Sequence, residues 1–159
     1  MSGTLVIEEV DPQGPEAMSL LREATLETRS LYPELTAPGA PMPTNPPLQE
    51  RAAYFVAFLA GTPVGCGALR PLNGATAEVR RVYVLQAHRR SGVARALLAH
   101  LQRAASDLHY AVLRIETGNR QLSAMELYES FGFQRIAPFG EHANDPTSVC
   151  YEKRLTPLN

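Results

Sequence analysis

The stretch from Val82 to Ala94 restricts the fold of this chain more than any other. It begins with the β-branched and aromatic run Val82-Tyr83-Val84, passes through a basic loop at Arg89 and Arg90, and continues as an amphipathic helix opened by Gly92. A helix that begins in this way presents unpaired backbone N–H groups and the positive end of its dipole. We therefore expect a strand–loop–helix unit whose loop binds a phosphate or pyrophosphate group.

Length and composition are those of one globular domain, and we treat residues 1–159 as a single domain. The formal net charge of −1 argues against a nucleic acid or an anionic membrane as the main partner. Cys66 and Cys150 are far apart and match no metal-ligand spacing, so we expect two reduced thiols and no metal site. No window is long enough to span a bilayer and residues 1–10 do not resemble a signal peptide, so we expect a cytoplasmic protein.

The order of secondary-structure signals predicts a mixed α/β domain. Apolar residues at helical spacing indicate helices from Pro15 to Leu31, from Val93 to Leu108 and from Gln121 to Phe131. Asn73-Gly74 indicates a hairpin turn, because both positions tolerate positive φ. Three hairpin-connected strands followed by strand–helix–strand units do not suit a doubly wound nucleotide-binding fold. The predicted strands cover residues 4–10, 54–60, 64–72, 77–84, 110–116, 133–139 and 149–154.

Residues 33–47 hold six prolines and one glycine, a composition that excludes regular structure. A loop of this length inside a compact domain is usually functional or disordered. Two interpretations stay open, a loop that covers the substrate and a mobile connector.

Two motifs resemble the GNAT N-acetyltransferase superfamily. The loop Arg89-Arg90-Ser91-Gly92-Val93-Ala94 fits its Arg/Gln-x-x-Gly-x-Gly/Ala pattern and follows residues 77–84, which resemble the family's fourth strand. Residues 124–133 (Ala-Met-Glu-Leu-Tyr-Glu-Ser-Phe-Gly-Phe) resemble its Ala-x-x-Leu-Tyr-x-x-x-Gly-Phe element. The resemblance covers nearly the whole chain, and residues 139–140 and 145–153 are similar to a bacterial subgroup of small, mostly uncharacterised members. It implies a central mixed sheet of six to seven strands, flanked by helices and splayed between the fourth and fifth strands.

The resemblance implies acetyl-CoA as the cosubstrate. Backbone N–H groups from Arg90 to Ala94 can bind its pyrophosphate, and Gly92 permits close approach. The side chains of Arg89, Arg90 and Arg95 either add charge-assisted bonds to the phosphates or are a solvated helix start. By resemblance, the backbone of Val82 to Val84 binds the pantetheine arm. Gln121 stands where many members have Asn, so Gln121 or Asn119 would contact the same arm. The expected cofactor-binding set is Val82, Tyr83, Val84, Arg89, Arg90, Ser91, Gly92, Val93, Ala94, Arg95, Asn119 and Gln121.

Acetyl transfer to an amine requires a neutral amine and a protonated leaving thiolate. Tyr128 is the candidate acid because a phenol can protonate a thiolate, and the alternative is a tyrosine packed on the helix face. Glu78 is the candidate base, directly or through water, and the alternative is a surface pair with an arginine. Strand alternation places Glu78 and Arg80 on one face, away from Val79 and Arg81, unless a bulge breaks the parity.

The acceptor region has fewer signals. His142 is an alternative base or a substrate contact, and Arg80 is expected to shape the acceptor pocket together with residues 33–47 and the loop after Phe139. Cys66 is interpreted as a small buried residue, as is Cys150, so direct transfer is favoured over an acetyl-cysteine intermediate.

The leading hypothesis is an enzyme, an acetyl-CoA-dependent N-acetyltransferase that acetylates a primary amine of a small molecule or peptide. A non-catalytic acyl-CoA-binding or sensing module is the alternative. A nucleic-acid-binding module centred on His88-Arg89-Arg90 is disfavoured by the charge balance. A homodimer through an exposed late strand stays open, and no motif identifies the acceptor.

Overall fold

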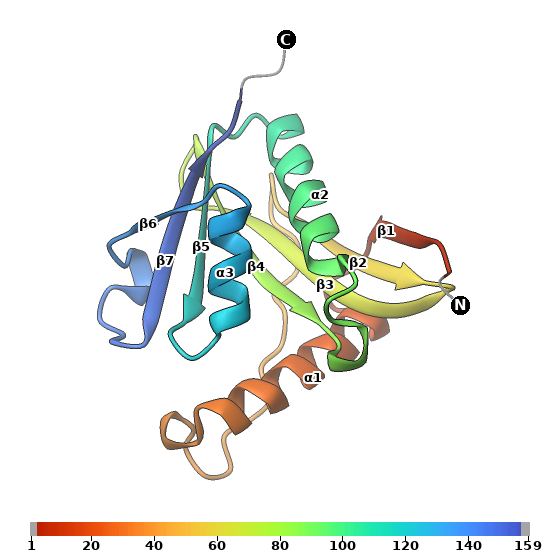
Figure 1. The fold of residues 1–159 in the computed structure, drawn as a ribbon, viewed down its shortest axis with the longest axis vertical. Helices are drawn as coiled ribbons and strands as arrows, with labels where there is room; N and C mark the ends of the chain where they lie inside the picture. Colours follow the sequence, from red (N-terminus) through yellow and green to blue (C-terminus); the bar gives the residue numbers. More distant parts are fainter. Residues whose placement is uncertain (1–2, 157–159) are drawn as a thin grey trace.

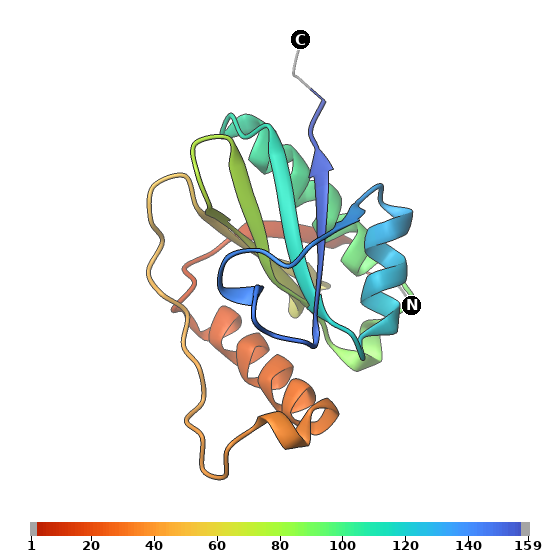
Figure 2. The same ribbon diagram turned by 90° about the vertical axis from the view of Figure 1, so that its left-hand side faces the viewer.

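The computed structural model describes residues 3–156, which form one open seven-stranded sheet in the order β1-β2-β3-β4-β5-β7-β6. Helix α1 (Pro15–Leu31) covers one face, and α2 (Val93–Asp107) and α3 (Leu122–Ser130) cover the other (Figures 1 and 2). The mixed α/β sheet expected from the sequence is confirmed. The strands are β1 (Leu5–Glu9), β2 (Ala53–Leu59), β3 (Thr62–Pro71), β4 (Thr76–Val84), β5 (Val112–Gly118), β6 (Gln134–Ile136) and β7 (Ser148–Arg154), and 3-10 helices lie at Pro33–Leu35, Gln86–His88 and Gly140–His142.

The sheet opens between β4 and β5. These two strands are parallel, and their register runs only from Thr76 opposite Val112 to Val79 opposite Ile115. All other neighbouring strands in the sheet are antiparallel. Beyond Val79 the facing edges of β4 and β5 have no ladder partner, so the splay predicted from the family resemblance is confirmed. An open edge of this kind can accept an extended ligand as if it were another strand.

The β3–β4 hairpin turns where Asn73-Gly74 predicted, but for a different reason. Neither Asn73 nor Gly74 has a positive φ. Instead the Asn73 Oδ1 accepts hydrogen bonds from the backbone N–H groups of Ala75 at 3.0 Å and Thr76 at 2.9 Å. The turn is therefore held by an asparagine side chain rather than by left-handed backbone. It sets the register that places Arg70 of β3 opposite Glu78 of β4.

A β-bulge in β4 changes the side on which Arg81 lies. The β3–β4 register shifts between Cys66 and Ala68, and Arg81 has a φ of 61°. The Arg81 Nε donates to Asn45 Oδ1 at 3.0 Å, and the Asn45 Nδ2 donates to the Pro12 carbonyl just before α1. Arg81 thus lies on the α1 side together with Arg80. The sequence analysis expected alternation to separate them unless a bulge intervened, and the structure has this bulge, which adds one residue and breaks the period of two.

Two glycines in β3 allow α2 to lie close to the sheet. A Cβ atom on Gly65 would be 3.1 Å from Leu97 Cδ1 of α2, and one on Gly67 would be 2.8 Å from Leu101 Cδ1. Any larger residue would push α2 outward. The buried stripe of α2 is the predicted one up to Ala105, and it comprises Val93, Leu97, Leu98, Leu101 and Ala105. Tight packing of this stripe fixes where the N-terminus of α2 lies relative to the end of β4.

The proline-rich segment 33–47 runs along α1 and is tied to it. The Arg29 guanidinium donates to the Ala40 carbonyl at 3.1 Å, and Asn45, which is only 2% exposed, donates to the Pro12 carbonyl at 2.8 Å. Buried hydrogen bonds at the end of the segment argue against a mobile connector. Within residues 3–156, the helices are too short or too polar to span a bilayer.

Candidate functional site

Two adjoining cavities occupy the place where β4 and β5 separate. The first measures about 550 Å³ and lies between α1, segment 33–47, the middle of β4 and the start of α3. The second measures about 150 Å³, and Glu78 and His142 belong to its walls. Both have Val79, Arg80, Arg81 and Glu116 in their walls, so they form one continuous cleft. The walls of the first include Leu21, Thr28, Pro41, Tyr54, Cys66, Gln121 and Tyr128.

The N-terminus of α2 forms a backbone seat at one end of β4. Gly92 is its N-cap with a φ of 87°, and no atom lies within 4 Å of the position that a Cβ would occupy. Gly92 makes no side-chain cap hydrogen bond, and the first three helical N–H groups, those of Val93, Ala94 and Arg95, have no backbone acceptor in the described chain. Free N–H groups at the positive end of a helix dipole are suited to bind phosphate.

The basic side chains around this seat differ in whether hydrogen bonds to other residues already hold them. The Arg89 Nη2 donates to Glu27 at 2.7 Å and its Nε donates to the Val84 carbonyl at 3.0 Å, so Arg89 ties the loop to α1 and β4. The Arg95 Nη2 donates to Ser130 Oγ at 2.7 Å. Arg90 is exposed and has no hydrogen bond or ion pair to the residues described, so it is the arginine most free to reach a phosphate. The Ser91 hydroxyl donates to the His88 carbonyl.

Two residues were alternatives for a contact to the pantetheine arm. Gln121 lies in the wall of the larger cavity, at the N-cap of α3. Asn119 is exposed in the turn after β5, where its backbone N–H donates to the Thr147 carbonyl. The structure therefore favours Gln121. The backbone of Val82 to Val84 lies on the open edge of β4.

Tyr128 of α3 is buried next to the splay. Its ring makes edge-on contacts with the rings of Phe133 and Tyr151, at centroid distances of 6.1 and 6.0 Å. Burial, with a smaller contribution from the Glu116 carboxylate, raises the pKa of the Tyr128 phenol far above its usual value. The hydroxyl has no hydrogen-bond partner in residues 3–156, and Tyr128 belongs to the cavity wall. The cleft thus borders a protonated phenol that is free to bind a ligand.

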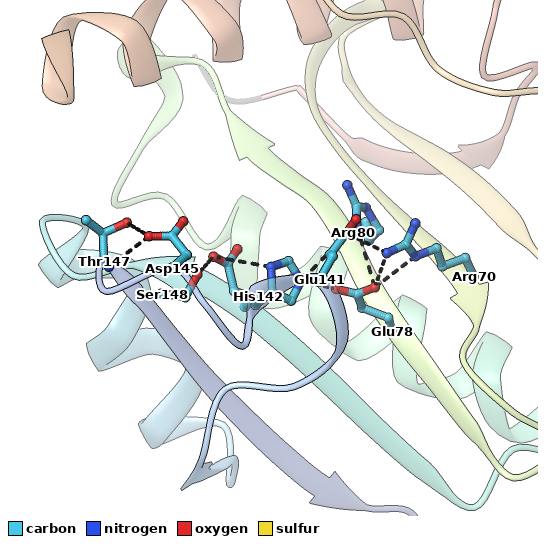
Figure 3. A network of polar contacts seen from close by, with 9 residues as sticks. Arg70, Glu78, Arg80, Glu141, His142, Asp145, Thr147 and Ser148 are labelled. Atoms are coloured by element: carbon cyan, nitrogen blue, oxygen red, sulfur yellow. Dashed lines mark hydrogen bonds and ion pairs between the residues drawn. The ribbon is translucent and has the colours of Figure 1, made fainter. Parts of the chain in front are cut away.

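Glu78 lies at the centre of a network of charged side chains (Figure 3). Its side chain is only 2% exposed, its Oε1 accepts from Arg70 Nε at 2.8 Å, and its Oε2 is 2.9 Å from His142 Nε2. The expected alternative, a pair with an arginine, is present in the contact with Arg70, but the carboxylate is buried and does not lie on the surface. Glu78 and His142, which the sequence presented as competing bases, are in direct contact.

His142 lies between two carboxylates. Its Nε2 faces Glu78, and its Nδ1 is 3.6 Å from Glu116 Oε2, which accepts from the Ser148 hydroxyl at 2.6 Å. The imidazole also packs edge-on against Phe139 at a centroid distance of 5.3 Å. Glu78 of β4, Glu116 of β5 and Phe139 of the late loop all contact the ring. These three elements together therefore set its orientation.

The sequence reasoning missed Arg70 and Glu141. The Glu141 Oε1 accepts from Arg80 Nη1 at 2.6 Å and from Arg70 Nη2 at 2.7 Å, and these two guanidinium groups hold the pKa of Glu141 at about 2. Arg70 could have been found by counting back from the hairpin turn, since it pairs across the strands with Glu78. Glu141 lies in a 3-10 helix whose position no periodic pattern predicts.

Glu78, Glu141 and His142 place ligand atoms within 4.8 Å of one another, close enough to hold a metal ion. Arg70 and Arg80 donate to the same two carboxylates. The cations of this cluster are therefore guanidinium groups, which disfavours a metal ion at this position.

Both cysteines are buried and unpaired, which agrees with their interpretation as small core residues. Burial raises the pKa of the Cys66 thiol to about 12, and its Sγ donates to the Arg81 carbonyl at 3.1 Å. Burial also raises the pKa of the Cys150 thiol. A thiol that stays protonated is a poor nucleophile, so neither cysteine suits an acetyl-enzyme route.

Comparison with known proteins identifies relatives over most of the chain. Residues 18–133 match the acetyltransferase (GNAT) family. The chain is 40% identical over 93 residues to the uncharacterized N-acetyltransferase YsnE of Bacillus subtilis, covering 57% of this chain and 62% of that protein. It is 36% identical over 103 residues to an IAA acetyltransferase of Azospirillum brasilense, covering 64% of this chain and 67% of that protein. The match thus spans less than two thirds of the length of the Bacillus relative.

Solved structures share the fold over nearly the full length. A protein described as an acyl-CoA N-acyltransferase from Klebsiella pneumoniae has a TM-score of 0.81 and 27% identity, over 96% of this chain and 99% of that one. A GNAT family acetyltransferase from Elizabethkingia anophelis, solved with acetyl-CoA bound, has a TM-score of 0.67 and 19% identity, over 95% of this chain and 98% of that one.

Proposed function

The chain belongs to the GNAT acetyltransferase family, whose members transfer acetyl groups from acetyl-CoA to amines, and we propose that it acetylates a primary amine of a small molecule or peptide in a ternary complex. One observation carries this proposal. The open edge of β4 leads from the Gly92 seat to a cleft that has Tyr128 and the Glu78–His142 pair in its walls. A donor site and proton-transfer groups therefore lie along one path.

The residues present fit acetyl-CoA. The N–H groups of Val93 to Arg95 and the open space above Gly92 would hold the pyrophosphate, and Arg90 would add a charge-assisted bond. The backbone of Val82 to Val84 and the amide of Gln121 would hold the pantetheine arm. Bound acetyl-CoA supplies an activated acetyl group as its thioester. The same β4 N–H groups can stabilise negative charge that develops on the thioester oxygen.

The acceptor amine would lose its proton to His142. With Glu78 accepting a hydrogen bond from Nε2–H, the Nδ1 of His142 carries the free electron pair and can take the proton. Glu116, whose Oε2 is 3.6 Å from Nδ1, would attract the ammonium form of the acceptor into the cleft. In this arrangement Glu78 is a positioning residue for the imidazole and Arg70 holds Glu78.

Tyr128 would protonate the leaving thiolate. Because burial keeps its phenol protonated and no described residue accepts its proton, the hydroxyl can donate to sulfur as the thioester bond breaks. The alternative is a module that binds acyl-CoA without turnover, and no contact in the structure favours it over the enzyme.

The direct test is a panel of primary amines incubated with acetyl-CoA and the full-length protein. We expect at least one amine to release free CoA in step with an N-acetyl product identified by mass spectrometry. Acetyl-CoA binding without amine-dependent CoA release throughout the panel would contradict catalysis and favour the binding module. Initial rates at varied concentrations of both substrates should give intersecting lines, whereas parallel lines would contradict direct transfer.

A further inference from the structure

Arg81 is an arginine of the cleft that has no carboxylate partner among the described residues. Arg81 is half-buried, and its Nε donates a hydrogen bond to Asn45 Oδ1 at 3.0 Å. In residues 3–156 it forms no ion pair, and no hydrogen bond uses its Nη groups. Burial and the neighbouring Arg80 charge lower the pKa of Arg81. A partly buried cation without an anionic partner is costly unless a ligand supplies one.

The neighbouring arginines show the contrast. Arg80 donates to Glu141 at 2.6 Å and lies 3.6 Å from Glu78, and Arg70 donates to both of these carboxylates. Those two carboxylates are therefore already used by Arg70 and Arg80. Arg81 faces Arg80, Arg70, Tyr54 and Cys66, none of which is an anion at neutral pH. Of these three arginines, Arg81 is therefore the one without a carboxylate partner in the described residues.

Tyr54 provides a second unused donor beside Arg81. It is 3% exposed, belongs to the wall of the larger cavity, and its hydroxyl has no hydrogen-bond partner in the described chain. Burial raises the pKa of this phenol, so it remains a donor. A guanidinium fork and a buried hydroxyl on one side of a cleft match an oxygen anion, which is the acceptor that guanidinium groups bind most strongly.

We propose that Arg81 binds a carboxylate of the acceptor, so that the substrate is a small amine that also carries a carboxylate, such as an amino acid. This inference rests on the proposed acetyl transfer. Arg81 and His142 lie in the walls of the same cavity of about 150 Å³. One small molecule can therefore place its carboxylate on Arg81 and its amino group at His142.

The anion that Arg81 would bind is not a phosphate of the donor. The phosphate seat begins at Gly92, past the end of β4, whereas Arg81 lies in the middle of that strand. The bulge at Arg81 directs its side chain to the α1 side of the sheet, toward Asn45. The anion recognised there must belong to the second substrate.

The test compares L-amino acids with their C-terminal amides as acceptors, in wild type and in the Arg81→Met, Arg81→Lys and Arg103→Met variants. Arg103 is exposed on α2 and gives the same change of net charge away from the cleft. The ratio of kcat/KM for acid over amide should fall about 100-fold in Arg81→Met. It should fall less in Arg81→Lys, because an ammonium keeps the charge but loses the fork. It should not change in Arg103→Met. The amino group of an amino acid and that of its amide differ in basicity, but this difference is the same for every variant. It therefore cancels when the acid-to-amide ratio is compared between variants.

A binding measurement separates this inference from the proposed function. With CoA present, N-acetyl amino acids should raise the melting temperature of wild type and of Arg103→Met but not of Arg81→Met. All variants should bind acetyl-CoA normally, which shows that they are folded. An unchanged acid-to-amide ratio in Arg81→Met would overturn the inference while acetyl transfer stands. If no amine is acetylated, the proposed function fails, and a melting shift that Arg81→Met retains would overturn the carboxylate site as well.

Discussion

The proposed donor end and the proposed acceptor end of the cleft are built in different ways. The donor end consists of backbone N–H groups from one short segment, Gly92 to Arg95, and the open edge of β4. The acceptor end consists of side chains brought together by the fold. Arg70 and Glu141, for example, share a 2.7 Å contact although they are 71 positions apart.

This difference predicts how each end responds to mutation. A backbone seat is insensitive to most side-chain changes and is damaged only where a side chain enters it. A network of charged groups depends on every member, because removing one leaves its buried partner unpaired. Substitutions at the acceptor end should therefore change turnover, and substitutions at the donor end should change acetyl-CoA affinity.

The largest effect is expected for Glu78→Gln. The amide keeps the shape but no longer accepts a charge-assisted bond from His142, so turnover should fall about 1,000-fold, within the range of general acid–base catalysis. Acetyl-CoA affinity, measured by calorimetry, should not change. The matched control is Glu152→Gln, which removes a carboxylate that pairs with Arg114 at 2.9 Å on β5. Loss of acetyl-CoA binding in Glu78→Gln would contradict the expectation that substitutions at the acceptor end leave acetyl-CoA affinity unchanged.

Tyr128→Phe should lower turnover about 100-fold and leave acetyl-CoA affinity nearly intact, because only the proton for the leaving thiolate is lost. Steady-state rates and calorimetry together measure the two effects. The control is Tyr151→Phe, which alters a core tyrosine in contact with Tyr128 but removes a hydroxyl that donates to Glu129. Wild-type turnover in Tyr128→Phe would eliminate it as the acid.

Gly92→Val should weaken acetyl-CoA binding about tenfold while changing turnover little at saturating acetyl-CoA. The valine would enter the seat and would also be strained at a φ of 87°. Gly61→Val separates these causes, because Gly61 has a φ of 82° and equally open surroundings in the β2–β3 turn. Both variants should lose a similar amount of stability, on the order of 1–2 kcal/mol. If Gly61→Val loses as much affinity, the seat is not at Gly92.

The smallest effect is expected for Glu141→Gln, which unties the late loop from Arg70 and Arg80. At pH 7 the loss of unfolding free energy should be below about 1 kcal/mol, because Glu141 is exposed and its ion pairs are screened by solvent. The folded-state pKa of Glu141, at about 2, is below its unfolded value, so the stabilisation is complete above the unfolded pKa and is lost as the pH falls toward 2.

Urea unfolding at a series of pH values measures the unfolding free energy that Glu141→Gln loses. The difference between wild type and Glu141→Gln should therefore be constant near neutral pH and shrink below about pH 4.5. Glu126→Gln, at an exposed position of α3, controls for the change in net charge. A difference that grows with acidity would contradict the ion pairs.

Features that depend on neighbouring residues were predictable. The helix beginning at Gly92, the hairpin at Asn73-Gly74 and the position of Tyr128 in its motif all follow from local patterns, and the structure has them where expected. Even so, the hairpin was located correctly for the wrong reason, since the Asn73 side chain and not a positive φ holds the turn.

Features that depend on register or on a loop path were not predictable. Strand alternation alone assigns Arg81 to the other face, and the sequence could name a bulge as the exception but could not tell that β4 contains one, which reverses every side chain that follows it. The contact between Glu78 and His142 joins positions 64 apart, and the path of the late loop decides it. No periodic pattern in the sequence contains that path.

The sequence by itself predicted a phosphate seat, because a backbone seat at a helix N-terminus needs only a few consecutive residues with the right conformational preferences, and the family resemblance added acetyl-CoA as the expected donor. Only the tertiary structure decided which side chains meet at the proposed acceptor end. Whether Glu78, Arg81 and His142 are neighbours depends on two hydrogen bonds to the Asn73 side chain in a turn, one bulge in β4 and the packing of a late loop. Charge interactions fall off over a few ångströms in a protein, so such small displacements decide which groups act together.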